Sequence, residues 1–232
     1  MNPPGFLTSS WLVARKDMLL EWRTLDTWSS SAIFAVVVLL VFQFAVAGGA
    51  AQQLTGADLV PGVLWLAIAF SSVVGIARSM DSERQGDTLS ALFRSPVDRG
   101  AIYAGKLVAN CIKLAALELV LVPLAIVFFN ASLAGFAWLK LILVLALCSF
   151  GLCALGTLFG AIVSRVGRGE ALLATLLLPS ATPLLLAGVT ATAAVFHGDE
   201  LTTVTRWLGM ALGFDLLYFF LALATFEFVL EE

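Results

Sequence analysis

The chain has 232 residues, of which 60% are hydrophobic and 12% are charged, and its formal net charge is −3. Soluble domains usually carry roughly 25% charged residues, so this composition excludes an ordinary soluble domain and predicts an integral membrane protein. The small net charge and the lack of a basic patch also argue against a nucleic-acid partner.

The first expected element is an amphipathic helix over residues 11–28. Apolar residues, among them Trp11 and Trp22, recur there at near-helical spacing with charged residues between them. Trp rings are favoured at membrane interfaces, so we expect this helix to lie along the inner membrane surface. A helix packed on a soluble partner is the alternative. No cleavable signal is expected, because the first apolar run starts only at Ser31 and is long enough to span the membrane.

Six apolar segments are long enough to cross a bilayer as helices. A hydrocarbon core about 30 Å thick requires about 20 apolar residues in a helix. The segments are continuously apolar, whereas barrel strands would be shorter and alternating, so the predicted fold class is all-α and polytopic. One membrane domain over residues 1–232 is expected, with spans at residues 31–50, 60–77, 102–129, 138–164, 171–196 and 204–229.

Basic residues predict the orientation, because short cytoplasmic loops retain Lys and Arg. One side of the expected bundle carries most of them, and the other side carries only Arg206. Both termini are therefore expected in the cytoplasm. The basic residues on that side are Arg15, Lys16, Arg23, Arg78, Arg84, Arg94, Arg99, Arg165 and Arg168.

Three charged residues fall well inside the expected spans, away from the span ends: Lys113, Glu118 and Asp215. Charges in hydrocarbon are costly and are therefore candidates for function. Lys113 and Glu118 are five positions apart, so they occupy different faces of one helix, and each is better satisfied by a neighbouring helix or a wet cavity. Two interpretations stay open, a structural ion pair or hydrogen-bonded cluster and a substrate path. An intramembrane enzyme using Glu118 and Asp215 is disfavoured, because no histidine, serine or metal constellation accompanies them.

Prolines and glycines mark the packing of two spans. Pro179 and Pro183 each delete a backbone hydrogen bond, so the fifth span is expected to kink near mid-membrane. Such a kink can line a substrate path, although kinks are common in membrane bundles. Gly156 and Gly160 form a GxxxG motif in the fourth span, which permits close helix packing.

Cysteine and histidine predict no metal site. Cys111, Cys148 and Cys153 lie inside expected spans and are interpreted as small apolar filler. The single histidine, His197, is expected in the loop after the fifth span. It is interpreted as an ordinary loop residue, with axial ligation of a metalloporphyrin as the less favoured alternative.

One motif is a false signal. Residues 100–106, GAIYAGK, match the GxxxxGK part of a nucleotide-binding loop. However, Leu107 replaces the Ser or Thr that binds magnesium, and no strand precedes the match. The pattern continues as a helix, so the chain is not expected to be an ATPase or another enzyme.

The segment over residues 78–100 holds much of the inner charge. Gly86 is expected to end the second span, and Asp87 to cap a new helix of about two turns. Leu89 and Leu92 belong to an apolar stripe at helical spacing. The stripe could pack on the bundle, or it could contact a cytosolic protein.

The same segment also contains the expected start of the third span. Ser95 is typical of an N-cap, with Pro96 at the first helical position and Asp98 at the third. This arrangement is close to a capping box. The third span is therefore expected to begin just after Ser95.

These motifs resemble a known family. DSERQGDTLSALFRSPVDRGAIYAGK over residues 81–106 is similar to the ERxxGTLxxLLxxPVxRxxIxxGK pattern of ABC-2 type permease subunits. PGVLWLAIAFSSVVGIARSM before it, LLLPSATPLLLAGVTAT in the fifth span and the terminal FEFVLEE resemble the haem exporter B subunit of cytochrome c maturation. The likeness covers nearly the whole chain. Asp87 departs from the pattern as an extra residue between the usual Gly and Thr-Leu.

The resemblance implies a permease without its own ATPase that serves haem delivery for c-type cytochromes. It implies a separate ATP-binding subunit that holds the ATP, a second permease copy and further membrane proteins of cytochrome c maturation. The implied location is the bacterial inner membrane, in contact with lipid, and haem is implied as transported substrate rather than as a bound cofactor. By position, the coupling helix that contacts the ATPase would contain Glu83, Arg84, Gly86, Leu89, Leu92, Arg94 and Pro96.

Two functional alternatives remain beside haem export. The chain could be an ABC-2 permease for a lipid-linked sugar or a drug. It could also be a non-transporting membrane subunit that uses the energy of ATP to release a haem chaperone. A haem path would need cations for the propionates, and Lys113 is the only mid-span cation that the sequence offers.

Overall fold

The computed structural model describes residues 5–24, 26–47, 54–85, 98–166 and 169–229. This part of the chain is helical and contains no strand, and six of its helices are long and apolar enough to cross a membrane. The all-α, polytopic prediction is therefore confirmed. The helices are α1 Phe6–Thr24, α2 Asp26–Ala47, α3 Gly56–Gln85, α5 Arg99–Phe128, α6 Ala137–Val166, α7 Gly169–His197 and α8 Leu201–Val229.

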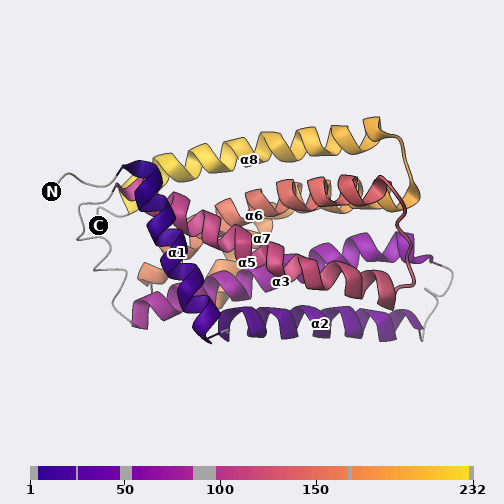
Figure 1. The fold of residues 1–232 in the computed structure, drawn as a ribbon, viewed down its shortest axis with the longest axis horizontal. Coiled ribbons are helices and arrows are strands. Elements are labelled where there is room, and N and C mark those ends of the chain that lie inside the picture. Colours follow the sequence, from indigo (N-terminus) through magenta and orange to yellow (C-terminus); the bar gives the residue numbers. More distant parts are fainter. Residues whose placement is uncertain (1–4, 25, 48–53, 86–97, 167–168, 230–232) are drawn as a thin grey trace.

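Six helices run side by side along the bundle, and α1 lies across them at one end (Figure 1). The end of α3, the start of α5, the end of α6, the start of α7 and the end of α8 lie at this same end. Two of the basic residues that predicted the orientation, Arg15 and Arg78, are exposed on these elements. The helix expected over residues 11–28 is thus present as α1, although it begins and ends earlier and α2 starts at Asp26.

The start of α5 corrects one prediction. Asp98 is the N-cap, with φ −56° and ψ 129°, and its Oδ1 accepts a hydrogen bond of 2.8 Å from the backbone N–H of Gly100. Asp98 is therefore outside the helix, and the prediction that Ser95 caps this span was wrong. An aspartate satisfies the free N–H groups at a helix start and its charge also suits the positive end of the helix dipole.

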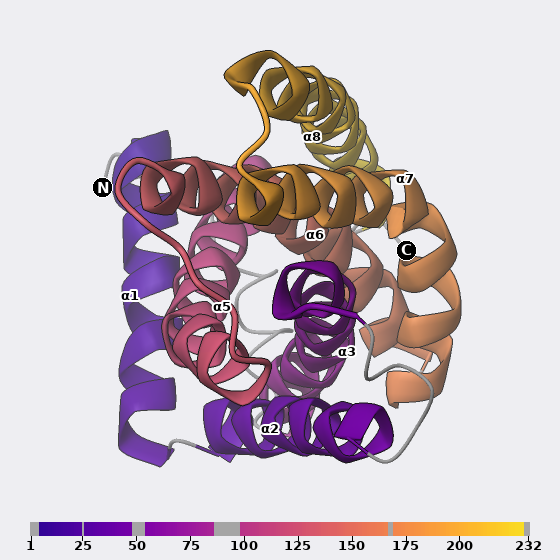
Figure 2. The same cartoon turned by 90° about the vertical axis from the view of Figure 1, so that its right-hand side faces the viewer.

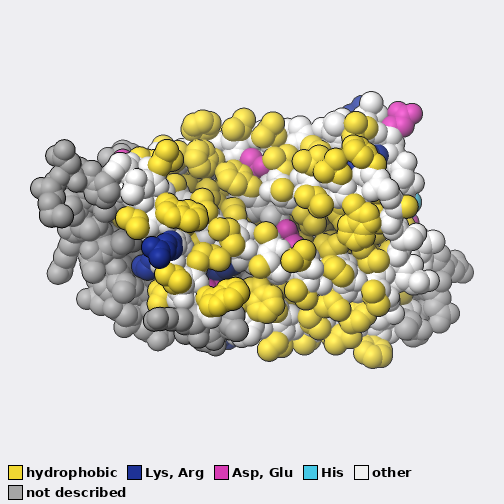
Figure 3. Space-filling view, in the orientation of Figure 1, with side chains coloured by type: hydrophobic (Ala, Val, Ile, Leu, Met, Phe, Trp, Pro, Cys, Tyr) yellow, Lys and Arg dark blue, Asp and Glu magenta, His cyan; other side chains and the backbone are white. Residues whose placement is uncertain are grey.

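The core lies between α3 and α6, the two most buried spans, whereas α2 and α8 are the least buried. Figure 2 shows α2 and α8 on opposite sides of the bundle, and Figure 3 shows one face of the bundle, which is largely hydrophobic. Apolar side chains such as Phe44 on α2 and Phe220 on α8 are exposed. Lipid is the solvent that such a surface requires.

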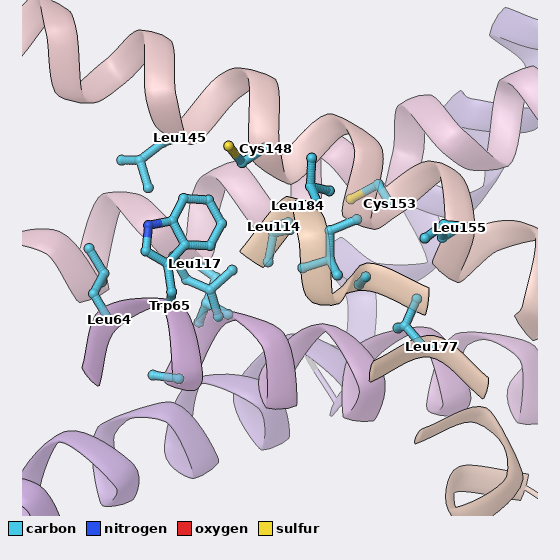
Figure 4. Packing of buried hydrophobic residues seen from close by; sticks show 14 of the residues in the cluster. Leu64, Trp65, Leu114, Leu117, Leu145, Cys148, Cys153, Leu155, Leu177 and Leu184 are labelled. Atoms are coloured by element: carbon cyan, nitrogen blue, oxygen red, sulfur yellow. The ribbon is translucent and has the colours of Figure 1, made fainter. Parts of the chain in front are cut away.

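Glycine allows α3 and α6 to approach closely. A Cβ on Gly156 would lie 2.2 Å from Cδ1 of Ile76, and one on Gly160 would lie 2.9 Å from Cγ2 of Ile76. The GxxxG motif is therefore used inside the chain, where small residues let helices pack in the absence of a hydrophobic driving force. Figure 4 shows the adjoining core, in which the sulfur atoms of Cys148 and Cys153 lie among leucines.

Trp65 joins α3 to α7 within this core. Its Nε1–H donates a hydrogen bond of 2.9 Å to Oγ1 of Thr192, and the ring is almost fully buried. The ring packs on Gly188, where an added Cβ would lie 2.6 Å from its Cε2 atom. Gly188 is thus required by the size of its neighbour.

Gly188→Ala is expected to lower the free energy of unfolding by about 1–3 kcal/mol, because the indole ring must shift within a packed core. Gly213→Ala on α8 is the matched control, since a Cβ there meets nothing within 4 Å. That control should leave stability unchanged or raise it by about 1 kcal/mol, because alanine favours helix. Thermal unfolding in one detergent compares the two; equal midpoints would show that the Trp65 contact is not tight.

Candidate functional site

Helix α1 packs along α5 (Figure 2), and two pairs of a lysine and a carboxylate cross this contact. Gly105 makes this contact possible, because a Cβ there would lie 2.6 Å from the carbonyl oxygen of Ser10 and 2.7 Å from Cβ of Val13. Gly105 and Lys106 are the last two residues of the GxxxxGK match, and both lie within α5. A phosphate-binding loop needs exposed backbone N–H groups, which a helix interior does not offer.

One ion pair across this seam joins Lys106 and Asp17. The Nζ of Lys106 lies 3.6 Å from Oδ2 of Asp17, and their side chains are only 3% and 7% exposed. Lys16 also approaches Asp17, with 3.0 Å between Nζ and Oδ1, although this contact lacks the alignment of a hydrogen bond. A buried charge is tolerated only when it is paired, so α1 supplies what Lys106 needs.

A second pair joins Lys113 to Glu21, again between α5 and α1. The Nζ of Lys113 lies 4.0 Å from Oε2 of Glu21 and donates a hydrogen bond of 3.1 Å to Oγ of Ser79 on α3. Glu21 also accepts a hydrogen bond of 2.7 Å from the backbone N–H of Trp28, in the first turn of α2. These contacts connect α1, α2, α3 and α5 at one point.

The sequence singled out Lys113 but missed its partners. Asp17 and Glu21 are four residues apart, and Lys106 and Lys113 are seven apart, so each pair lies on one face of its helix. Two carboxylates on the expected interfacial helix and two lysines on a span were a visible complementary pattern. What the sequence did not contain was the information that these two helices are neighbours.

A small cavity of about 40 Å³ lies beside Lys113, between α2, α3, α5 and α6. Its lining includes the buried atoms Oγ of Ser71 and Nε1 of Trp28, which have no hydrogen-bond partner among the described residues. Asn110, also in the lining, donates a hydrogen bond to Thr157. The cavity is polar enough and large enough for a few water molecules, but far too small for a porphyrin.

Glu118 has a different environment from Lys113. Its carboxylate is buried and accepts a hydrogen bond from the hydroxyl of Ser149 on α6. It also lies at a groove of about 360 Å³ between α5 and α6, whose other lining residues, such as Trp138, are apolar. Glu118 and Lys113 thus bind different helices, as expected for two faces of α5.

Asp215 is sealed between α6, α7 and α8. It is 2% exposed, and neither carboxyl oxygen has a hydrogen-bond partner within the described ranges. Gly151 on α6 leaves room for it, because a Cβ there would lie 2.0 Å from its Oδ1 atom. An unsatisfied carboxyl group inside a membrane bundle is costly, so Asp215 remains a candidate for a functional role that this arrangement does not reveal.

Pro179 and Pro183 both lie within α7, which continues through them as one helix. Hydroxyl groups reach the carbonyl oxygens nearby: Ser180 donates to Leu176 O at 2.8 Å, and Tyr218 of α8 donates to Ser180 O at 2.7 Å. The carbonyl groups that lose their usual donor to the prolines are those of Thr175 and Pro179, so these two hydroxyl bonds do not replace the missing backbone bonds, although the bond from Tyr218 ties α8 to α7. The expected kink and substrate-path role stay predictions.

His197 lies at the opposite end of the bundle as the last residue of α7. Its Nδ1 is 2.8 Å from Ala193 O and its Nε2 is 2.9 Å from Oδ1 of Asp58 on α3. Both ring nitrogens therefore face oxygen atoms, and haem ligation would require one of these contacts to break. Lys140 at the same end donates a hydrogen bond of 3.1 Å to Asp199 O.

The structure does not describe the side chains of the predicted coupling residues. Glu83 and Arg84 belong to α3, but only their backbone is described. The remaining five, Gly86, Leu89, Leu92, Arg94 and Pro96, lie in the segment 86–97, which is not described. Their role stays a prediction.

Comparison with protein families shows to which family the chain belongs. The family model described as CcmB protein matches residues 8–229. The chain belongs to the CcmB protein family. This is the haem exporter protein B family, so the resemblance drawn from the sequence is confirmed. Comparison with curated proteins gives no match.

Membership in the CcmB family gives the general function of the chain. The chain is a multi-pass membrane protein and a permease component of the haem exporter for cytochrome c maturation, in a complex with other proteins. CcmB proteins are membrane subunits of a transporter. A lipid-linked sugar or a drug as substrate thereby loses its support.

Lys106→Met is expected to lower the free energy of unfolding by about 3 kcal/mol, because it leaves Asp17 buried without its partner on α5. Adding Asp17→Asn should recover most of this loss, since the double variant buries no unpaired charge. Lys140→Met is the control and should cost less than about 1 kcal/mol, because Lys140 is half-exposed. Additive losses in the double variant, measured by unfolding in one detergent, would contradict a coupled pair.

Proposed function

We propose that this chain converts ATP hydrolysis on a separate subunit into movement of α3 and α5. The observation that carries the proposal is where these two helices meet. The end of α3 and the start of α5 lie at the α1 end of the bundle (Figure 1), and both helices line the cavity beside Lys113. A partner that pushes on these two helix ends would therefore act directly on the walls of the cavity.

The proposed partner is an ABC ATP-binding subunit, because the described chain contains no phosphate-binding loop and its GxxxxGK match is helical. Two permease copies and two ATP-binding subunits form the proposed complex, together with other membrane proteins of cytochrome c maturation. The α1 end of the bundle faces the cytoplasm of a bacterial inner membrane, with both termini on that side. The exposed Arg15 and Arg78 support this orientation.

The ATP hydrolysis that is coupled to this permease drives one of two processes. In the first, haem crosses the bilayer with this permease. In the second, ATP drives the release of a haem-loaded chaperone from a neighbouring subunit. The small size of the cavity beside Lys113 favours the second process for a single chain in this conformation, because no porphyrin fits there.

Leu89→Asp or Leu92→Asp is expected to abolish co-purification of the ATP-binding subunit while the bundle stays folded. An aspartate in the apolar stripe replaces an apolar contact with the partner by a charge. That charge would have to leave water when the partner binds, which is unfavourable. Leu201→Asp makes the same chemical change at the opposite end of the bundle, where Leu201 is exposed, and should leave pairing intact. Normal pairing of both coupling variants would show that the stripe packs on the bundle instead.

Proteoliposomes that contain the permease, its ATP-binding subunit and the neighbouring subunit loaded with the haem chaperone can separate the two processes. We expect ATP-dependent release of the haem chaperone without haem accumulation in the lumen, for the reason of cavity size given above. Haem inside the vesicles is measured by absorbance after removal of external haem, with a variant ATPase that cannot hydrolyse ATP as control. ATP-dependent haem accumulation would contradict the second process.

A further inference from the structure

We propose that a groove between α1 and α5, named here the α1 groove, binds haem at the membrane surface. Two adjoining hollows form it, of about 310 and 250 Å³. They share Met18 and Trp22 of α1 and Ile112 of α5, so they form one continuous groove. Together they reach the size range of pockets for small molecules, roughly 300–1,000 Å³.

The walls of the α1 groove are aromatic. Trp11 and Trp22 are exposed and line it from α1, and Trp28 lines its inner end from the start of α2. Three of the six tryptophans in the chain therefore face one groove. Flat indole rings suit a flat aromatic ligand, because large aromatic surfaces pack well face to face or edge to face.

The charge of the groove suits an acidic ligand. Arg15 lines its outer end and is exposed, and its planar guanidinium matches the geometry of a carboxylate. Lys113 lines the inner end, where Glu21 partly offsets its charge. Arg15 is therefore the residue that can hold the propionates of a haem in the groove.

Met18 provides the third element of haem recognition. It lies three residues from Arg15, which places both on the same face of α1, about one turn apart. It lines both hollows and is only half-exposed, so its thioether lies at the middle of the groove. Methionine sulfur is one of the side-chain ligands that haem iron accepts, and the groove thus pairs an iron ligand with a propionate partner.

An acidic phospholipid would share the carboxylate-like charge but not all of the other features. A lipid headgroup requires cations and is compatible with tryptophans at the membrane interface, but it gains nothing from a thioether. The combination of Arg15 with Met18 therefore favours haem over lipid.

The α1 groove also adjoins the interior of the bundle. Trp28 and Lys113 line both its inner hollow and the small cavity between α2, α3, α5 and α6. A movement of α5 would change the groove and this cavity together. The proposal rests on the proposed function insofar as haem is the substrate, and it places that substrate outside the bundle rather than within it.

Haem titration of the purified chain in nanodiscs of phosphatidylcholine tests the α1 groove. We expect saturable binding with one haem per chain and a shifted Soret band. Arg15→Gln should weaken binding about tenfold or more, the loss expected for one charged hydrogen bond. Met18→Leu keeps the size of the side chain and should change the Soret band, because it removes the iron ligand.

Arg206→Gln is the matched control, since Arg206 is an exposed cation on α8 at the opposite end of the bundle. It should bind haem as the unaltered chain does. Equal haem affinity and equal spectra for Arg15→Gln, Met18→Leu and the unaltered chain would overturn the proposal, as would absence of saturable binding. Equal thermal midpoints of all variants would show that they are folded.

A parallel titration in nanodiscs containing phosphatidylglycerol distinguishes haem from lipid. Haem binding that persists in these nanodiscs supports a haem site. Binding that disappears there, with retention of the acidic lipid through Arg15, would overturn the haem assignment in favour of a lipid site. Co-purification of the ATP-binding subunit with Arg15→Gln and Met18→Leu separates this proposal from the proposed permease function. If both variants retain the ATP-binding subunit and bind haem as the unaltered chain does, the α1 groove is rejected as a haem site and the permease function is unaffected.

Discussion

The pairing of charges between α1 and α5 is the interaction on which the rest of this bundle depends. Lys106 and Lys113 lie on a helix that is otherwise apolar enough to cross the membrane. Unpaired, each would cost several kcal/mol in such a setting. Asp17 and Glu21 of α1 lie against them, so the docking of α1 helps α5 to keep two lysines. An interfacial helix is therefore part of the folded bundle rather than an accessory to it.

The bundle has two kinds of internal contact. Between α3, α6 and α7 the contacts are dry and close, made by Gly156, Gly160 and Gly188 against Ile76 and Trp65. Between α1, α2, α3 and α5 they are polar, and a small cavity lies beside them. Dry, interlocked packing resists rearrangement, whereas hydrogen bonds that can be exchanged with water allow it. The polar side is thus the place where a permease of this family can change shape at the lower cost.

Sequence reasoning predicted the six spans, the interfacial helix and the family, because hydrophobic length and motif spacing are local properties of the chain. It placed Lys113, Glu118 and Asp215 correctly inside helices but could not name Ser79, Ser149 or Gly151 as their neighbours. Continuously apolar helices carry no strong periodicity that would tell which face meets which partner. Ser95 was mistaken for the cap of α5 because Ser-Pro and Asp98 are both good start signals three residues apart, and only the backbone of Asp98 decides between them.

The two ion pairs along the α1–α5 seam have a mechanical consequence. A single point of attachment would let one helix pivot about it, whereas two points and the Gly105 contact between helices resist rotation and sliding alike. The two helices are therefore expected to move as one unit. Force applied where α5 begins would then carry α1, and the tryptophans on it, along with α5.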